Sequence, residues 1–559
     1  MKFLAPALAS LALVACGPTD TPVDSAIETP AEFMPNVLSG NIEAHIRFLA
    51  SDYLQGRDVG TDGYEIAANY VAAQMQLLGL EPAGDNGGYY AQVPLQDVRA
   101  DLDSAYLAID GIEAEIGRQA LIGSNPAVLE SEVTAPLVFV GYGVSAANRD
   151  HDDYADIDAA GKIVVVMNGV PDGFPTEERA HHISGRTKLE VAAAHGAVGM
   201  ISLTAWTEEQ VAGFAGNYFS LPAVQLTTAT GPSGYDAVTV SASVTADLGA
   251  SLFDDAPMSL ADVQAAMSAE DGASFPTFDL PHTVTMRQRT ISEPFTAPNV
   301  VGMLRGNDPA LADEVVVLTA HLDHIGSIHD AMRGRGACRS SDDADQICNG
   351  AVDNASGVAV MLETARAFIE QGTPRRSVLF VALAGEEKGL LGSENFARNP
   401  TVPAEAMVAN VNLDMPVIVY EFDDVIAFGA DHSNLGPIAA RAAARMDIAV
   451  SPDPIPQQSL FVRSDHYNFV REGVPSFLMT GFSSPDPRWD EGEGFMGFLN
   501  THYHRQTDQL DGELEVLFEQ GAKFANINYL IAREIADSDE RPAWNADSFF
   551  GNLYGDQSE

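Results

Sequence analysis

Apolar runs alternate with helix-period segments through the second half of the chain. The runs include EVVVLTAHLDH, RRSVLFVALAGEE, AMVANVNLDM and VPSFLMTGF, and the segments between them include SGVAVMLETARAFIEQG and GPIAARAAARM. Nearly continuous Val, Leu, Ile and Ala strands separated by helices are typical of a mainly parallel sheet that is buried on both faces. We therefore predict an α/β fold whose central, mainly parallel sheet is covered by helices on both faces.

The first part of the chain divides into two further regions. Residues 38–114 begin with two helix-period patterns, of which the second runs from Gly63 to Leu80 and ends near Gly79. Residues 115–290 change to short β-rich runs such as APLVFVGYGV and GKIVVVMNGV, each bounded by Gly, Pro, Asp or Asn. This organisation predicts a main domain formed by residues 38–114 and 291–540, a β-rich domain inserted at 115–290, and a C-terminal tail at 541–559.

The N-terminus has the pattern of a secretory signal. It consists of one basic residue, an apolar stretch of about a dozen residues and small residues before Cys16. The apolar stretch is too short to span a bilayer. Leu13 to Cys16 resemble the lipobox of bacterial lipoproteins, so residues 1–16 are expected to be a lipoprotein signal, with lipidation at Cys16. Residues 17–37 would then be a polar, proline-rich tether to the membrane of the bacterial envelope, in the periplasm or at the outer membrane. An ordinary cleaved signal with an incidental cysteine is the alternative.

Net charge and cysteine content limit the partners and the cysteine chemistry that can be expected. The 559 residues include 79 acidic and 30 basic side chains, a formal charge of −49, which argues against a nucleic-acid partner and favours a hydrated acidic surface. Cys338 and Cys348 lie ten residues apart in a loop-like segment and, in an oxidising compartment, predict a disulfide. A cysteine metal site is the competing interpretation, but no further cysteine or CxxC spacing supports it.

Polar side chains end the buried runs of the predicted sheet. In open α/β sheets, ligands bind at the carboxyl edge of the strands, so these residues should meet there. They are His321 and Asp323, Glu386 and Glu387, and Asp414, joined by Asp353 at the entrance to a helix where Asn354 or Ser356 could act as the cap.

So many carboxylates at one edge would repel each other unless a cation neutralised them. Imidazole and carboxylate together suit zinc, and five protein ligands exceed what one catalytic zinc uses. The pattern therefore predicts two zinc ions that share a bridging carboxylate.

These pieces together resemble peptidase family M28, the di-zinc aminopeptidases, here with an inserted protease-associated domain. The resemblance rests on AHLDHIG, NGAVDNASG, GEEKGLLGS, NLDM, RSDHYNF and YHRQTDQLD, supported by LASDYLQGRDVGTDGYEIAANYVAAQM near the N-terminus. It spans most of residues 40–540 in the family's order. It implies a zinc exopeptidase that removes N-terminal residues from peptides.

The resemblance also implies a role for each site residue. His321 and Asp414 would hold one zinc, Glu387 and His504 the other, and Asp353 would bridge them. Asp323 would orient His321 through its carboxylate, Glu386 would be the general base, Tyr503 would donate a hydrogen bond to the oxyanion, and Arg463 is a candidate substrate contact. Arg505 and Gln506 follow His504 in place of the family's usual proline, which leaves His502 as an alternative ligand.

Several rival interpretations remain open. A carboxypeptidase for acidic C-terminal residues, a glutaminyl cyclase with a single zinc, and a non-catalytic receptor share this superfamily; intact ligand positions argue against the receptor. His181 and His182 fall in the inserted domain and are not expected to bind metal, and His324 is expected to pack or hydrogen-bond near the cleft. Ser464, Asp465 and His466 are consecutive, so they cannot form a catalytic triad.

Overall fold

A computed structural model describes residues 35–215, 221–227, 234–267, 276–328, 338, 344–489, 492–510 and 512–555. Cys16, the signal segment and most of the expected tether lie outside these residues. Residues 35–559 form one compact unit, which is the part of the chain described below.

The central sheet is mixed, with a parallel centre and antiparallel margins. Strand β14 (Val315–His321) pairs in parallel with β15 (Ser377–Leu383) and β16 (Met407–Asn412), and β16 pairs in parallel with β19 (Ser476–Gly481). β13 (Phe278–Leu304) borders β15 in antiparallel orientation, and β17 (Asp424–Phe428) borders β19 in the same way. The remaining strands of this sheet are β1 (Glu81–Pro82), β2 (Tyr90–Ala100), β11 (Ala223–Leu226) and β18 (Ala449–Ser451).

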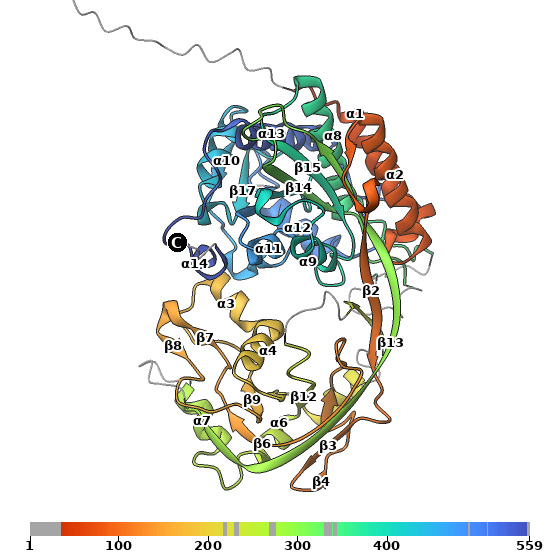
Figure 1. The fold of residues 1–559 in the computed structure, drawn as a ribbon. Helices are drawn as coiled ribbons and strands as arrows, with labels where there is room; N and C mark the ends of the chain where they lie inside the picture. Colours follow the sequence, from red (N-terminus) through yellow and green to blue (C-terminus); the bar gives the residue numbers. More distant parts are fainter. Residues whose placement is uncertain are drawn as a thin grey trace, which may run out of the picture. The chain divides into compact units, whose positions relative to one another are not determined.

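Helices cover both faces of this sheet, as the sequence predicts (Figure 1). Alternate residues of β14 enter different cores: Val316 and Leu318 pack into one apolar cluster, and Val315 and Val317 into another. The first cluster includes side chains of α1 (Ser39–Leu49), α2 (Asp62–Leu78), α8 (Gly357–Gln371), α10 (Leu435–Ala444), α12 (Glu493–Thr501) and α13 (Phe518–Asp537). The second includes side chains of α9 (Leu391–Arg398) and α11 (His466–Arg471).

Helix α2 begins and ends as its sequence predicts. The side chain of Thr61 accepts a hydrogen bond from the backbone of Tyr64 at the N-terminus, and Gly79 terminates the helix in a left-handed conformation with φ of 78°. Ala67, Val71 and Met75 are fully buried along one side. The helix therefore packs with the face that the sequence pattern indicates.

The β-rich region has its own sheet and its own core. Strand β13 is 27 residues long and joins the two sheets: its first half pairs with β3 (Tyr106–Ile109) and β6 (Glu130–Phe139), and its second half with β2. The other strands of this region are β4 (Ile112–Glu113), β5 (Ala120–Ile122), β9 (Ile163–Met167), β10 (Gly199–Leu203) and β12 (Val240–Val244), with β7 (Ser145–Ala146) and β8 (His151–Asp152) forming a separate small ladder. Its helices are α3 (Thr176–Ile183), α4 (Gly185–Ala194), α5 (Glu208–Phe214), α6 (Ala246–Ser251) and α7 (Leu260–Met267). A core cluster within residues 105–286 belongs to this region alone.

The C-terminal residues are packed where a tail is expected. Trp544 forms a β-bridge with Ser433, and α14 (Phe549–Tyr554) buries Phe550 completely in the core of the main domain. Apolar burial of an aromatic side chain contributes about 2 kcal/mol toward holding this segment against the main domain. The sequence pattern missed this segment because it is too short to show a helical period.

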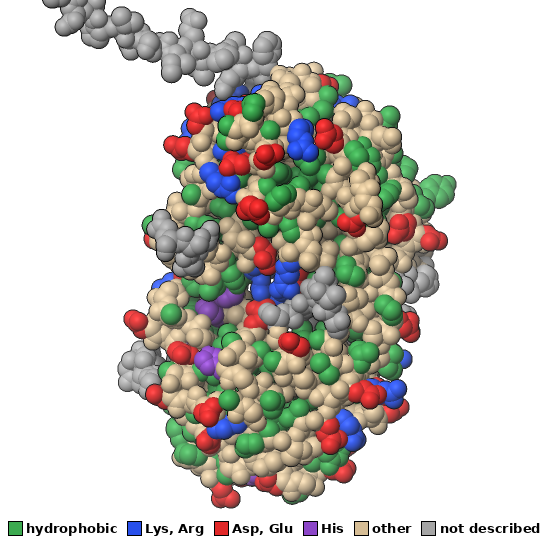
Figure 2. Space-filling view, viewed as in Figure 1, with side chains coloured by type: hydrophobic (Ala, Val, Ile, Leu, Met, Phe, Trp, Pro, Cys, Tyr) green, Lys and Arg blue, Asp and Glu red, His purple; other side chains and the backbone are tan. Residues whose placement is uncertain are grey.

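The structure shows how charged side chains are distributed on the surface and whether any described helix could cross a membrane. Figure 2 shows acidic side chains spread over the visible face and interspersed with Lys and Arg, rather than gathered in one patch. Within the described part of the chain, no helix has the length and apolar character needed to cross a bilayer.

Candidate metal centre

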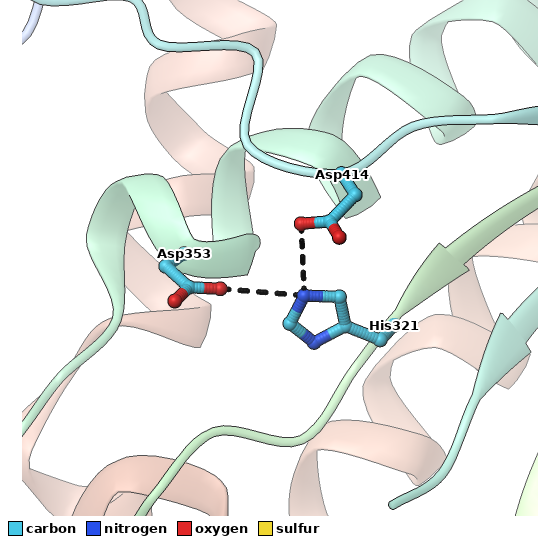
Figure 3. Close-up of side chains that lie close together, drawn as sticks. All are labelled: His321, Asp353 and Asp414. Atoms are coloured by element: carbon cyan, nitrogen blue, oxygen red, sulfur yellow. Dashed lines mark hydrogen bonds and ion pairs between the residues drawn. The ribbon is translucent and has the colours of Figure 1, made fainter. Parts of the chain in front are cut away.

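Three of the predicted ligands meet at the carboxyl ends of β14 and β16. His321 Nε2 lies 3.1 Å from Asp414 Oδ1 and 3.3 Å from Asp353 Oδ1 (Figure 3). His321 is the last residue of β14, and Asp414 follows β16. Asp353 lies in the segment Ala351–Ser356 before α8, where its own φ of −106° and ψ of 91° are not helical. The strand ends and the helix entrance therefore converge as the sequence predicts.

A second group forms on the other oxygen of Asp353. His504 Nε2 lies 3.4 Å from Asp353 Oδ2 and 3.0 Å from Glu387 Oε2, without the alignment of a hydrogen bond to either. His502 instead stacks on Phe498, with ring centroids 5.9 Å apart. The structure thus brings His504, and not His502, to the cluster.

The spacing of these atoms fits metal ligands. Donor atoms around a tetrahedral zinc, with bonds of about 2.0 to 2.1 Å, lie about 3.3 Å from one another. The distances within the His321 group, 3.1 and 3.3 Å, and within the His504 group, 3.0 and 3.4 Å, bracket this value. Imidazole nitrogens and carboxylate oxygens are also the donor set that zinc accepts.

The charges at the site explain why a cation is needed. Burial lowers the pKa of His504, but Glu387 and Asp353 outweigh it and raise that pKa to about 10. Burial also lowers the pKa of His321, while Asp414 and Glu386 raise it well above its usual value. In the metal-free protein, protons on the imidazoles therefore supply positive charge that a bound cation would replace.

Asp323 acts through different atoms from those expected. The sequence predicts that its carboxylate orients His321, but His321 Nδ1 contacts the backbone oxygen of Asp323 at 3.1 Å. The carboxylate instead accepts the backbone N–H groups of Glu386 at 3.1 Å and Glu387 at 3.3 Å. Asp323 thereby fixes both the imidazole and the turn that carries the glutamate pair.

The side chains of the adjacent residues Glu386 and Glu387 lie in different surroundings. Glu387 faces His504, whereas Glu386 lines a cavity together with His321 and Asp414. Burial raises the pKa of Glu386 well above its usual value, and Asp414 and Glu387 add to the effect while His321 opposes it. A carboxylate with a raised pKa is suited to accept a proton near neutral pH.

The cavity beside the cluster has one polar side and several apolar walls. Tyr503 lines it and stacks on His504, with ring centroids 3.8 Å apart. Arg463 lies at the exposed rim of the cavity. The apolar walls are Met415, Phe428, Leu460, Leu478 and Phe495.

Supporting residues that sequence reasoning left without a role hold the ligands in place. Ser464 donates to Asp414 Oδ2 at 2.5 Å, and Asn412 donates to Ser464 at 2.7 Å. Asp508 accepts the backbone N–H groups of Val352 at 2.9 Å and Asp353 at 3.0 Å. The only signal in the sequence was the occurrence of Ser464 and Asp508 inside the quoted motifs.

A buried arginine braces the loop before Asp353. Arg57 is 1% exposed and donates to the backbone oxygens of Leu49, Leu322, Asn349 and Gly350. Burial lowers its pKa to about 10, against the opposing effect of Asp508. Arg57 therefore places a positive charge behind the acidic cluster and joins the N-terminal helices to it.

Other predicted features are found as follows. Cys338 and Cys348 form a disulfide with their Cα atoms 5.5 Å apart, as predicted. Asn354 Oδ1 accepts the backbone N–H of Gly357, the first residue of α8, at 3.0 Å, whereas Ser356 at the N-cap position makes no side-chain cap bond. His181 shares a hydrogen bond with Tyr467 at 2.7 Å. Two groups among the described residues are compact enough to hold a metal ion: His321, Asp353 and Asp414, and His324, Asp353 and Glu387.

Two parts of the chain match the models of known protein families. Residues 299–517 match the model of peptidase family M28, and residues 133–233 match the PA domain. A protein of Pyrenophora tritici-repentis called "Probable zinc metalloprotease" is 50% identical over 66 residues, which cover 12% of this chain and only 15% of that protein. The "Probable lipoprotein aminopeptidase LpqL" of Mycobacterium tuberculosis is 24% identical over 472 residues, covering 81% of this chain and 76% of that protein.

A solved structure was also found to be similar. It is an aminopeptidase from Aneurinibacillus sp. strain AM-1, with 20% sequence identity and a TM-score of 0.48, and the match covers 90% of this chain and 95% of that one.

Proposed function

With residues 299–517 assigned to peptidase family M28 and residues 133–233 to a PA domain, we propose that the chain is a di-zinc aminopeptidase that is exported and acts on peptides. One zinc would be held by His321 and Asp414, the other by Glu387 and His504, with Asp353 between them.

The position of the Asp353 carboxylate is the main support for two metal ions. The two oxygens of Asp353 face different donor sets, Oδ1 toward His321 at 3.3 Å and Oδ2 toward His504 at 3.4 Å. A carboxylate that serves a single ion has no need of an imidazole at each oxygen. This arrangement supports a bridging role for Asp353.

The chain's own residues supply the remaining chemistry. Zinc ions at this centre would lower the pKa of a water molecule and polarise the peptide carbonyl. Glu386, which lines the cavity, accepts the proton of the attacking water and returns it to the leaving amine. Tyr503, on the same cavity, donates a hydrogen bond to the carbonyl oxygen as it becomes negative.

The cavity favours an uncharged side chain at the cleaved end of the peptide. The cavity is lined by the apolar side chains of Phe428, Leu478 and Phe495 as well as by the predicted metal ligands. Burying an aliphatic side chain of the substrate against these apolar side chains would favour binding. The acidic surroundings favour the substrate's terminal ammonium group. Both features support an aminopeptidase over a carboxypeptidase for acidic residues.

Glu386→Gln tests the mechanism. The variant should keep two zinc ions per chain, measured by elemental analysis. Its kcat on an aminoacyl reporter such as a leucyl anilide should fall about a hundredfold to ten-thousandfold, because only proton transfer is removed. The matched Glu387→Gln variant should lose zinc as well as activity. Near-normal turnover in Glu386→Gln would refute the role of the base.

Substrates run in parallel test the reaction class. Aminoacyl reporters should be hydrolysed and blocked peptides with a free acidic C-terminus should not. The opposite result would support the carboxypeptidase, and cyclisation of an N-terminal glutamine with one zinc per chain would support the cyclase.

Export and anchoring belong to the same proposal. Residues 1–16 have the pattern of a lipoprotein signal, and one relative is named a lipoprotein aminopeptidase. Expression in a bacterial host should yield a membrane-bound protein whose mature N-terminus is lipidated at Cys16. Cys16→Ala should release it from the membrane fraction; an unchanged distribution would refute anchoring.

A further inference from the structure

A buried imidazole that the proposed mechanism does not use lies beside the second donor set. His324 is 0% exposed, and its Nδ1 lies 2.7 Å from Glu387 Oε1. The other oxygen of the same carboxylate, Oε2, lies 3.0 Å from His504 Nε2. Each oxygen of Glu387 therefore has its own imidazole.

The distances distinguish a hydrogen bond from shared metal ligation. A separation of 2.7 Å is that of a charge-assisted N–H···O bond, whereas two ligands on one zinc lie about 3.3 Å apart. His324 Nδ1 is also 3.9 Å from Asp353 Oδ2, farther than His504 Nε2, which is 3.4 Å away. Among the described residues, His324 forms a group with Asp353 and Glu387 that is compact enough to hold a metal ion, but its 2.7 Å separation from Glu387 is that of a hydrogen-bond donor rather than of a second ligand on the same ion.

The ring of His324 is fixed by its neighbours. Gly350 has φ of +61°, and a Cβ atom there would lie 2.6 Å from His324 Cγ, so the imidazole occupies space that only glycine leaves free. The backbone N–H of His324 donates to the oxygen of Arg57 at 3.3 Å, and the ring of His504 meets it edge-on at 5.8 Å. Among the described residues, Nε2 has no hydrogen-bond partner, so Nδ1 makes the polar contact of the ring.

We propose that His324 is a positioning residue for the second metal ion. By donating from Nδ1 to Oε1 of Glu387, it keeps Oε2 directed at the point that His504 and Asp353 also face. The inference rests on the proposed function, because it assumes that Glu387 is a metal ligand. Loss of the donor would free the carboxylate to rotate, and outer partners of this kind change metal affinity by about tenfold to a hundredfold.

Two substitutions of His324 separate its donor atom from its bulk. In His324→Asn the side-chain amide nitrogen can take the place of Nδ1, whereas in His324→Gln it lies farther out, near the place of Nε2. The metal-free native protein and both variants would be titrated with zinc against a chromophoric chelator. Thermal unfolding of each metal-free protein checks that the variants fold.

The expected result is two tight zinc sites in the native protein and in His324→Asn. In His324→Gln, one site should weaken about tenfold to a hundredfold while the other is unchanged. X-ray absorption at the zinc edge should give about one imidazole per zinc in the native protein and the same in His324→Asn.

Other results would overturn the inference. Equal zinc affinity in all three proteins would show that the hydrogen bond has no positioning effect, with the proposed function intact. Loss of zinc in His324→Asn, together with more than one imidazole per zinc in the native protein, would make His324 a ligand instead. Absence of tight zinc from the native protein itself would overturn the proposed function, and this inference with it.

Discussion

Asp508 holds the backbone of the bridging residue, so replacing it with Asn should weaken both metal sites at once. Asp508 Oδ1 accepts Val352 N–H at 2.9 Å and Oδ2 accepts Asp353 N–H at 3.0 Å, with its side chain fully buried. Asn keeps one acceptor and turns the other into an NH2 group that faces an N–H donor. The turn that carries Asp353 must then shift or leave that donor unpaired.

The size of the effect follows from these two bonds. A hydrogen bond to a charged group contributes about 1.5 to 3 kcal/mol, and an unpaired buried donor costs about 1 to 3 kcal/mol. We therefore expect Asp508→Asn to lower the free energy of unfolding by about 2 to 4 kcal/mol. Because burial raises the pKa of Asp508 to about 7, urea unfolding of the metal-free protein is best measured at pH 8, where the native carboxylate is ionised.

A matched variant distinguishes loss of stability from loss of the site. Asp424, 7% exposed at the start of β17, accepts the backbone N–H of Ser483 at 2.5 Å and its hydroxyl at 3.1 Å. Asp424→Asn should also destabilise the protein but leave both zinc affinities unchanged, whereas Asp508→Asn should weaken each by about tenfold or more. If the two variants lost equal stability and both bound zinc normally, Asp508 would have no positioning role.

Three further predictions concern pH, the oxyanion and the inserted domain. Protonated His504, with its pKa raised to about 10, stabilises the metal-free fold fully below about pH 6.5, so the free energy of unfolding should fall as pH rises from 6.5 to 10. A free energy of unfolding that did not change over this pH range would contradict the prediction. In the zinc-loaded protein, the decrease with rising pH should be absent. Tyr503→Phe should reduce kcat by about a hundredfold to a thousandfold with unchanged zinc content; an unaltered kcat would exclude the hydrogen bond. Arg186 holds the 3% exposed Glu394 across the two regions through two 2.7 Å bonds, and Arg398 also pairs with Glu394 at 2.9 Å. Arg186→Ala should therefore lower the free energy of unfolding by about 1.5 to 3 kcal/mol and speed proteolysis of the inserted domain. Arg118→Ala, at a half-exposed pair, should do neither. Equal protease resistance in both variants would refute that docking role.

The parts of the site that the sequence could predict are those set by local pattern. His321 and Asp414 come at the ends of buried strands, and parallel strands end at one edge, so their meeting follows from the period of the apolar residues. The same reasoning gives helices on both faces of the sheet. It does not depend on any contact between distant side chains.

The parts that could not be predicted depend on how distant segments close on one another. Arg57 reaches its backbone partner at Gly350 across 293 positions, and Asp508 reaches Asp353 across 155. No local period specifies such pairs. Asp323 shows a further limit, since a residue type can be expected at a site while the atom that acts, its backbone oxygen, cannot.

The packing of the C-terminal residues could not be predicted for a related reason. Phe550 is buried only because the main domain offers an apolar site for a helix of six residues. Such a helix has no stability in isolation, so its sequence carries little signal. Tertiary packing determines whether a segment of this length is ordered.

Five side chains from distant positions are proposed to hold two metal ions, with the Asp353 carboxylate between them. Anomalous X-ray diffraction from zinc-loaded crystals, collected on both sides of the zinc absorption edge, tests this arrangement most directly. Two peaks are expected about 3.5 to 4 Å apart, one beside His321 and Asp414 and the other beside Glu387 and His504. A single peak, or peaks away from Asp353, would contradict it.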